Sequence, residues 1–262
     1  MLLPSSLLPS SDSFWEQYNA HLIANQSDSL NRADATDVGA DDVRVEDARV
    51  PLLDDTAQFI SHTLAESGQS LHLNFICTHN SRRSHFSQFW AAAAASAFGL
   101  GEILPCVSGG TEATACNERV IASLKRVGVS VETEKHDVDC SDTKIAHGAA
   151  ESQMPNPLYL ARFDSDSDTA PIRLFSKLYS DAVPDSDTPF VAMMCCDHVD
   201  ETCPLIPGAI RRVPLHYRDP KISDGTPQQE ETYDQRRDQI AIEMIYLMRK
   251  VRDLHQAIKK KR

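Results

Sequence analysis

The chain has 262 residues, which at about 150 residues per domain leaves room for one elaborated domain or one domain with a small appendage. Hydrophobic residues make up 41% and charged residues 24%, so a core can form and collagen-like or wholly disordered classes are excluded. The formal net charge of −12 makes the average surface repel nucleic acids and anionic membranes. An anionic ligand must therefore bind at a local positive site.

Three features bear on the cellular compartment. The longest apolar run, residues 90–98, is much shorter than the roughly 20 residues of a membrane span. An export signal would require a positively charged N-terminal region, but no Lys or Arg precedes Arg32. The seven cysteines are an odd number in a chain too long to need disulfide staples, which favours reduced thiols. We therefore expect a cytoplasmic protein.

Residues 1–70 differ in composition from the rest of the chain, because Ser, Asp and Ala dominate and apolar periodicity is weak. We expect an N-terminal helical and loop extension, with helices over 14–23 and 52–66. The second helix is indicated by apolar residues spaced at helical intervals, namely Leu53, Ala57, Ile60 and Leu64.

Residues 71–262 are predicted to form an α/β domain. Buried-strand patterns over 71–77 and 103–109 alternate with helix-forming segments over 84–98 and 117–127. This alternation predicts a parallel sheet of about four strands flanked by helices, with right-handed crossovers.

The second half of this domain continues the pattern after a polar stretch. Residues 132–155 lack a convincing period and are predicted to be a loop insertion. A long helix is predicted over 228–258, because its apolar residues recur every three or four positions. Four further strands are expected between these segments, over 158–163, 174–179, 190–195 and 210–215.

The segment around Cys77 carries the strongest chemical signal. Cys77 ends a strand, Arg83 follows six positions later, and Ser84 and a helix come directly after. A loop of this kind directs backbone N–H groups inward at the positive end of the helix dipole, where they bind an anion. The planar guanidinium of Arg83 can form hydrogen bonds to two oxygens of the anion. The positive field, together with the Ser84 hydroxyl, favours a thiolate at Cys77. A thiolate behind a bound oxyanion is a nucleophile aimed at its central atom. The alternative is an inert buried cysteine, which leaves the two adjacent arginines unexplained.

The run CTHNSRRS, residues 77–84, resembles the signature loop of the low-molecular-weight protein tyrosine phosphatases and of the thioredoxin-coupled arsenate reductases that share their fold. The resemblance extends over about 71–130 and 157–255. It implies that Cys77 is the nucleophile, that Asn80 fixes the loop's shape and that Ser84 donates to the thiolate. It also implies that the oxyanion is bound by Thr78, His79, Asn80, Ser81, Arg82, Arg83 and Ser84, with Arg83 as the clamp.

The chain departs from the family pattern at two positions. His79 stands where both families usually carry Gly, so either His79 adopts the unusual backbone angles or the loop differs slightly. Gln88 stands where some arsenate reductases use a carboxylate to bind potassium, so no cation or other metal is predicted.

Expulsion of an oxygen from the oxyanion requires a proton donor near the loop. Asp219, followed by Pro220, resembles the Asp-Pro that carries the general acid in both families. Pro220 restricts Asp219 to extended backbone angles and so fixes the aim of its carboxylate. Asp224 is the second candidate for the acid.

Cys196 and Cys203 lie seven positions apart, and Pro204 follows the second. This segment resembles the redox segment of the arsenate reductases. Reduction of arsenate to arsenite takes two electrons, which a thiol pair supplies by becoming a disulfide. The resemblance implies that Cys77 attacks arsenate, that Cys196 attacks Cys77 and releases arsenite, and that Cys203 then attacks Cys196. Thioredoxin, or another thiol system, would reduce the resulting disulfide as an external reductant, with no bound cofactor.

Two other interpretations of this segment stay open. A zinc site could use Cys195, Cys196, His198 and Cys203, although adjacent strand cysteines diverge. Alternatively, the thiols are structural. Cys195 also adjoins Cys196, and the family spacing favours Cys196 for the relay.

Three hypotheses of function arise from these residues. The leading one is an arsenate reductase that acts on arsenate and is regenerated by thioredoxin. The alternative is a low-molecular-weight protein tyrosine phosphatase that hydrolyses phosphomonoesters through a cysteinyl phosphate. The third is a non-catalytic thiol redox sensor with a vestigial anion loop. None of the three involves nucleic acid or a membrane.

Overall fold

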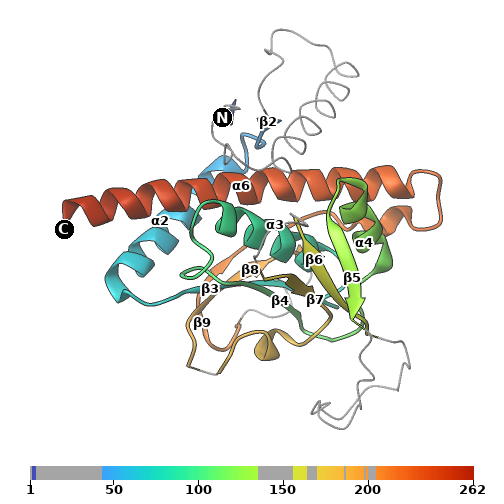
Figure 1. Cartoon of the computed structure of the whole chain (residues 1–262), viewed down its shortest axis with the longest axis horizontal. Helices are drawn as coiled ribbons and strands as arrows, with labels where there is room; N and C mark the ends of the chain where they lie inside the picture. The colour runs from blue at the N-terminus through green and yellow to red at the C-terminus, as the bar shows by residue number, and fades with distance from the viewer. Residues whose placement is uncertain are drawn as a thin grey trace.

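The computed structural model describes residues 2–3, 43–134, 156–163, 170–185, 187–197, 199 and 205–262. At its centre lies a parallel sheet of four strands, which confirms the predicted α/β fold (Figure 1). The strand order is β4-β3-β8-β9. The strands are β3 (His72–Cys77), β4 (Cys106–Gly110), β8 (Phe190–Met194) and β9 (Ala209–Val213).

The two central strands bring distant parts of the sequence together. β3 pairs with β4 on one side, where Cys77 lies opposite Gly110, and with β8 on the other, where Ile76 lies opposite Met194. Every residue of β8 and all but one of β3 are buried, as expected of parallel strands covered on both faces. The carboxyl ends of the strands meet at one edge, where such sheets usually bind ligands.

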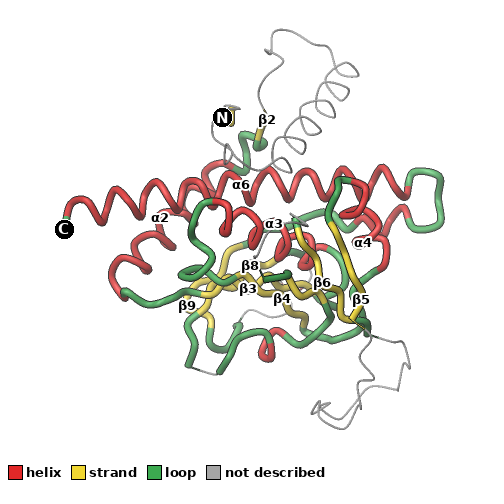
Figure 2. The backbone as a smooth tube through the Cα atoms, in the orientation of Figure 1, coloured by secondary structure: helices red, strands yellow, loops and turns green. Residues whose placement is uncertain are grey.

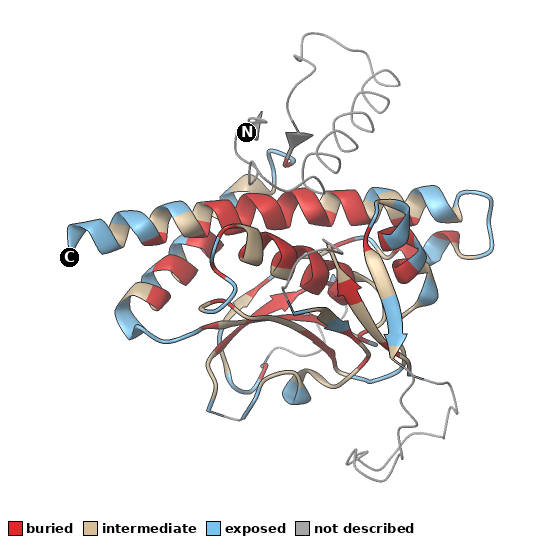
Figure 3. Cartoon of the chain, in the orientation of Figure 1, coloured by how far each residue is buried: buried red, intermediate tan, exposed pale blue. Residues whose placement is uncertain are grey.

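In the part of the chain that the structure describes, four α-helices accompany the sheet, and three of them pack against the last one. They are α2 (Val50–Ser67), α3 (Arg83–Ala97), α4 (Glu118–Arg126) and α6 (Gln229–Lys261). α3 contacts both α6 and the strands β3 and β4, so it lies between them (Figures 1 and 2). Burial is concentrated where these layers meet, whereas the ends of α6 are exposed (Figure 3). Among the described residues, no helix combines the length and apolarity that crossing a membrane demands.

The predicted helix over 52–66 is confirmed as α2, which begins with a proline in its first turn and ends at Gly68 in the left-handed conformation. Its buried side chains join the common core against α6. The predicted helix over 14–23 lies outside the described residues. The domain boundary at residue 70 stays a prediction.

A second sheet was not predicted as such. It is antiparallel, with the order β5-β6-β7, and consists of β5 (Ser130–Glu134), β6 (Leu158–Arg162) and β7 (Ile172–Leu174). The prediction of a loop from residue 132 is wrong for residues 132–134, which belong to β5; residues 135–155 lie outside the described ranges. β5 buries no residue fully, so its sequence lacks the apolar alternation of a half-buried strand. A short antiparallel pair, β1 (Leu2–Leu3) with β2 (Val43–Arg44), completes the described strands.

The predicted strand over 174–179 is also wrong. β7 ends at Leu174, Leu178 forms only an isolated bridge, and residues Tyr179–Asp181 form the 3-10 helix η2. The backbone N–H groups in between are used by side chains, because Ser176 N donates to Asn156 Oδ1 and Lys177 N donates to Asn80 Oδ1, both at 3.0 Å. These N–H groups are therefore unavailable for a ladder.

The end of β4 is glycine because other backbone segments approach it closely. A Cβ on Gly109 would lie 2.2 Å from the Cα of Tyr179, and one on Gly110 would lie 2.7 Å from the carbonyl oxygen of Thr78. Side chains here would push away both the segment after β7 and the loop after β3. The two glycines thus allow the cysteine loop to rest against β4.

Candidate active site

The cysteine loop, residues 77–84, joins β3 to α3. Four of its carbonyl groups accept hydrogen bonds from neighbouring segments, and no described residue accepts a hydrogen bond from the backbone N–H groups of 78–82. These N–H groups therefore remain available to an anion at the N-terminus of α3, as predicted for an anion nest. The outward bonds join Cys77 O to Thr111 N, Thr78 O to Glu112 N, His79 O to the Thr114 and Ser176 hydroxyls, and Ser81 O to Asn117 N.

Asn80 determines the curvature of the loop. With a φ of 42°, it is the single non-glycine residue with positive φ in the described ranges. Asparagine tolerates this left-handed conformation better than most residues. Its buried amide group donates to the hydroxyls of Ser84 (2.9 Å) and Ser108 (3.0 Å), while its oxygen accepts from Lys177 N. These three bonds hold the strained residue in place, which supports the predicted role of Asn80.

His79 does not adopt the left-handed conformation that the family's glycine suggested. Its side chain is exposed, and Nε2 lies 3.4 Å from Oε2 of Glu112, which is also exposed. We therefore place only the backbone of His79 in the anion nest.

The thiol of Cys77 lies beneath the loop and is 4% exposed. Its Sγ is 3.1 Å from the Ser84 hydroxyl, which is fully buried. Because the Asn80 amide already donates to that hydroxyl oxygen, the hydroxyl hydrogen is free to point at the sulfur. The structure thus places the Ser84 hydroxyl where the resemblance implied a hydrogen-bond donor to Cys77.

A buried polar network supports the loop from behind. Ser108 on β4 donates to Gln88 Oε1 at 2.6 Å, and Gln88 donates in turn to the Arg173 carbonyl at 3.1 Å. Nδ1 of His85 lies 3.4 Å from the Ser108 hydroxyl. This network was not predicted from the sequence, although His85 and Gln88 are conspicuous polar residues in the first turns of an otherwise apolar helix. Gln88 thus supports Asn80 through Ser108.

His85 provides a test of this buried network through pH. Burial, together with the nearby positive charge of Lys177, lowers the pKa of His85 to about 3. In the unfolded chain, where the pKa is about 6.5, the imidazole gains a proton as the pH falls, whereas the folded protein does not until about pH 3. The folded state therefore loses stability relative to the unfolded state below pH 6.5.

Between pH 7 and pH 5, we expect this effect of His85 to lower the free energy of unfolding by about 2 kcal/mol. Urea unfolding of the wild type and of His85→Gln at both pH values measures it. The loss in the variant should be smaller by that amount. Equal losses in both proteins would show that His85 is protonated in the folded state.

Arg83 and Asp219 meet at the mouth of the loop. Arg83 Nη2 donates to Asp219 Oδ2 at 2.8 Å, and Nη1 donates to the Tyr217 carbonyl at 3.0 Å. Asp219 has the extended backbone expected before a proline and begins the 3-10 helix η3 (Pro220–Ser223), with Oδ1 accepting from Lys221 N. The structure thus brings together the clamp and the acid that were predicted from segments 136 positions apart.

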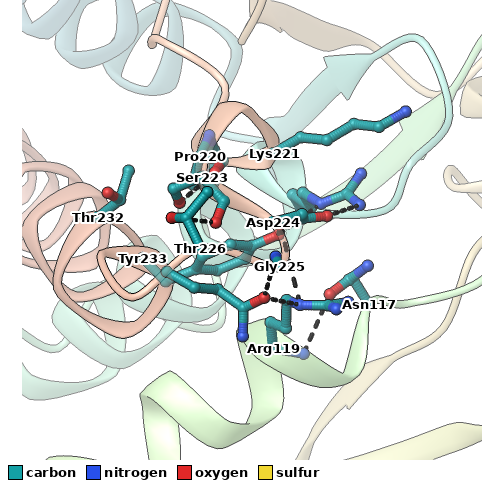
Figure 4. A network of polar contacts seen from close by, with 12 residues as sticks. Asn117, Arg119, Pro220, Lys221, Ser223, Asp224, Gly225, Thr226, Thr232 and Tyr233 are labelled. Carbon is teal, nitrogen blue, oxygen red and sulfur yellow. Dashed lines mark hydrogen bonds and ion pairs between the residues drawn. The ribbon is translucent and has the colours of Figure 1, made fainter.

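Arg82 faces a different partner from Arg83. Its Nε donates to the Tyr233 hydroxyl at 2.7 Å, and its Nη2 donates to Asp224 Oδ2 at 3.1 Å. Burial raises the pKa of Tyr233 to about 12, so its hydroxyl stays protonated and donates to Asp224 Oδ1 at 2.9 Å. Arg119 lies 3.8 Å from the same carboxylate (Figure 4). Asp224, the second candidate for the acid, is therefore part of a structural ion-pair network that links the cysteine loop to α6.

The two adjacent cysteines after β8 contact different parts of the site. Cys196 is 1% exposed, and its Sγ lies 3.7 Å from the Thr78 hydroxyl in the cysteine loop. The Cys195 thiol lies 3.6 Å from the Ser87 hydroxyl of α3. Burial raises the pKa of Cys195, and the neighbouring Cys77 raises it further. Cys196 therefore contacts the loop at Thr78, whereas the Cys195 thiol forms a hydrogen bond with α3.

Cys203 and His198 lie outside the described residues, so the second half of the predicted relay and the zinc alternative are not described. Within the described ranges, no three His, Cys, Asp or Glu side chains form a group that could hold a metal ion.

Comparison with known proteins gives matches only among solved structures. No family model and no curated protein matches the chain. One matching structure is an arsenate reductase in the phosphate-binding state, with 14% identity and a TM-score of 0.35, covering 69% of this chain and 98% of that one. Another is a thioredoxin-dependent arsenate reductase of Corynebacterium glutamicum, with 17% identity and a TM-score of 0.32, covering 95% and 87% respectively. At these identities and TM-scores, the matches carry no inference about activity, which must come from the site itself.

Proposed function

We propose that the chain is an arsenate reductase that uses Cys77, Cys196 and Cys203 as a thiol relay and is regenerated by thioredoxin. The observation that carries the proposal is the buried thiol of Cys196, 3.7 Å from the Thr78 hydroxyl and so next to the residue that follows the nucleophile. A phosphatase needs only one thiol at this position, whereas a two-electron reduction needs a second thiol.

In the first step, arsenate occupies the anion nest, and Arg83 turns its fork from Asp219 to the oxyanion. The Cys77 thiolate attacks arsenic, so that a sulfur–arsenic bond forms and an arsenic–oxygen bond breaks. The departing hydroxide takes a proton from Asp219, which must have gained that proton before the step.

In the second step, the Cys196 thiolate attacks the Cys77 sulfur. A disulfide forms, the electron pair of the sulfur–arsenic bond stays on arsenic, and arsenic(V) leaves as arsenite(III). The Cys203 thiolate then attacks Cys196 and releases the Cys77 thiolate. The two thiols of thioredoxin supply two electrons to reduce the Cys196–Cys203 disulfide.

The test is NADPH consumption by the purified protein with thioredoxin and thioredoxin reductase, started by addition of arsenate. We expect steady turnover in the wild type and at least a hundredfold loss in Cys196→Ser, as is typical when a required group is removed. Cys195→Ser is the matched control, because burial raises the pKa of the Cys195 thiol, which forms a hydrogen bond with Ser87 of α3. Its rate should stay within a few-fold of wild type. Cys203→Ser should release about one equivalent of arsenite and then stop.

The ion pair between Arg83 and Asp219 favours phosphomonoester hydrolysis as the second candidate, because a phosphatase also needs an acid beside the clamp. In that case NADPH is not consumed, and hydrolysis of an aryl phosphate survives both Cys196→Ser and Cys203→Ser. Oxidation of Cys77 by peroxide without turnover of either substrate would instead identify a redox sensor.

A further inference from the structure

The segment that precedes α2 reaches the candidate site through Arg49. Arg49 Nε and Nη2 donate to the two carboxylate oxygens of Glu243 on α6, at 3.0 and 2.7 Å. Its Nη1 donates to the His216 carbonyl at 3.1 Å. Glu243 is 1% exposed, so this ion pair is the main compensation for a carboxylate held away from water. Arg49 precedes the two ranges, 71–130 and 157–255, whose sequence resembles the phosphatase-like families.

Tyr217 extends this contact toward the clamp. Its hydroxyl donates to Glu243 at 2.8 Å, and its ring lies beneath the Arg49 guanidinium, 5.0 Å from its centre. Burial raises the pKa of Tyr217 well above its usual range, so the hydroxyl remains a donor. The backbone carbonyl of the same residue accepts from Arg83, and its N–H donates to the Cys195 carbonyl at 3.1 Å.

A continuous set of hydrogen bonds thus runs from Arg49 to Arg83. Arg49 donates to Glu243 and to the His216 carbonyl. The Tyr217 hydroxyl donates to the same glutamate, and the Tyr217 carbonyl accepts from Arg83. Asp219 follows two residues later in the same segment. Displacement of Tyr217 would therefore change the position of both the clamp and the acid.

We propose that Arg49 is a positioning residue for the oxyanion site, which fixes the segment 215–219 through Glu243 and Tyr217. The residues before α2 thereby take part in the site without touching the substrate. The effect on catalysis rests on the proposed function, whereas the effect on the segment 215–219 does not.

Two variants of Arg49 test the proposal. Arg49→Lys keeps the charge but loses the planar fork that spans Glu243 and the His216 carbonyl. Arg49→Met combined with Glu243→Gln removes the ion pair without leaving a buried charge, and so protects against simple unfolding. The matched control is Asp54→Asn, because Asp54 also joins α2 to α6, by accepting from Tyr246 at 2.6 Å and lying 3.1 Å from Lys250. Both of these partners lie on α6, and neither belongs to the segment 215–219.

Hydrogen exchange of the backbone N–H groups of 215–219 is the first measurement, and it is independent of activity. We expect exchange about tenfold faster in both Arg49 variants and unchanged in Asp54→Asn. The second measurement is protection of Cys77 from iodoacetamide by inorganic phosphate, which should need about tenfold more phosphate in the Arg49 variants only. Unchanged exchange of 215–219 in both Arg49 variants, or an equal increase in Asp54→Asn, would overturn the proposal. If the wild type turns over neither arsenate nor an aryl phosphate, the proposed function fails, and the exchange data still decide the role of Arg49.

Discussion

Replacement of Cys77 by Ser is expected to abolish arsenate-dependent NADPH consumption and any hydrolysis of aryl phosphates, by about 10⁴-fold or more. A serine hydroxyl is not ionised near neutral pH, so the bound oxyanion would face a much weaker nucleophile. The anion nest and Arg83 are unaffected by the change. Binding of inorganic phosphate, measured by calorimetry, should therefore stay within about threefold of wild type.

The control for this variant is Cys106→Ser, which exchanges the same atoms on β4, where the thiol donates to the Leu104 carbonyl at 3.4 Å. Its activity should stay within about twofold of wild type. More than one per cent residual turnover in Cys77→Ser would mean that another group is the nucleophile, and the assignment of the cysteine loop as a catalytic site would then be wrong.

Replacement of Arg83 by Lys is expected to lower kcat/KM for arsenate by about 10²- to 10³-fold. A lysine ammonium cannot replace the fork that holds Asp219 and the Tyr217 carbonyl and that would grip two oxygens of the substrate. Steady-state kinetics should show a higher KM as well as a lower kcat, because the clamp contacts the anion both before and during the attack.

The adjacent residue offers a matched comparison for this variant. Arg82→Lys removes the same fork one position earlier, but its guanidinium binds Tyr233 and Asp224. We expect it to lower the melting temperature with less than a tenfold effect on kcat/KM. A larger catalytic loss in Arg82→Lys than in Arg83→Lys would reverse the roles assigned to the two arginines.

The contrast between these arginines shows what could be predicted from the sequence. The strand, the loop and the helix around Cys77 are local features, and the positions of Arg83 and Ser84 follow from them. The role of Arg82 depends on Asp224 and Tyr233, which lie 142 and 151 residues away. No local pattern records such a contact, so the partners of the Arg82 side chain could not be predicted, and binding of the oxyanion by Arg82 stays a prediction.

His79 and β5 illustrate two further limits. Because the family carries Gly at position 79, unusual backbone angles were considered for His79. The left-handed residue in the structure is instead Asn80, which forms hydrogen bonds with Ser84, Ser108 and Lys177. β5 escaped prediction because it has exposed or half-buried residues on both faces and so shows no apolar period. The two central strands of the main sheet, β3 and β8, were predicted because they are continuous runs of buried, mostly apolar residues.

The pairing of β3 with β8 determines when the candidate site can form during synthesis of the chain. Thr78 and Cys196 touch across a separation of 118 residues, and α6, which covers α3, comes later still. Since a chain emerges from the ribosome from its N-terminus, Cys77 leaves the ribosome long before the elements that enclose it. Closure of so long a loop makes assembly of the site a late event in folding. We therefore expect the Cys77 thiol to be exposed to oxidants and to other nascent thiols until the last quarter of the chain has been made.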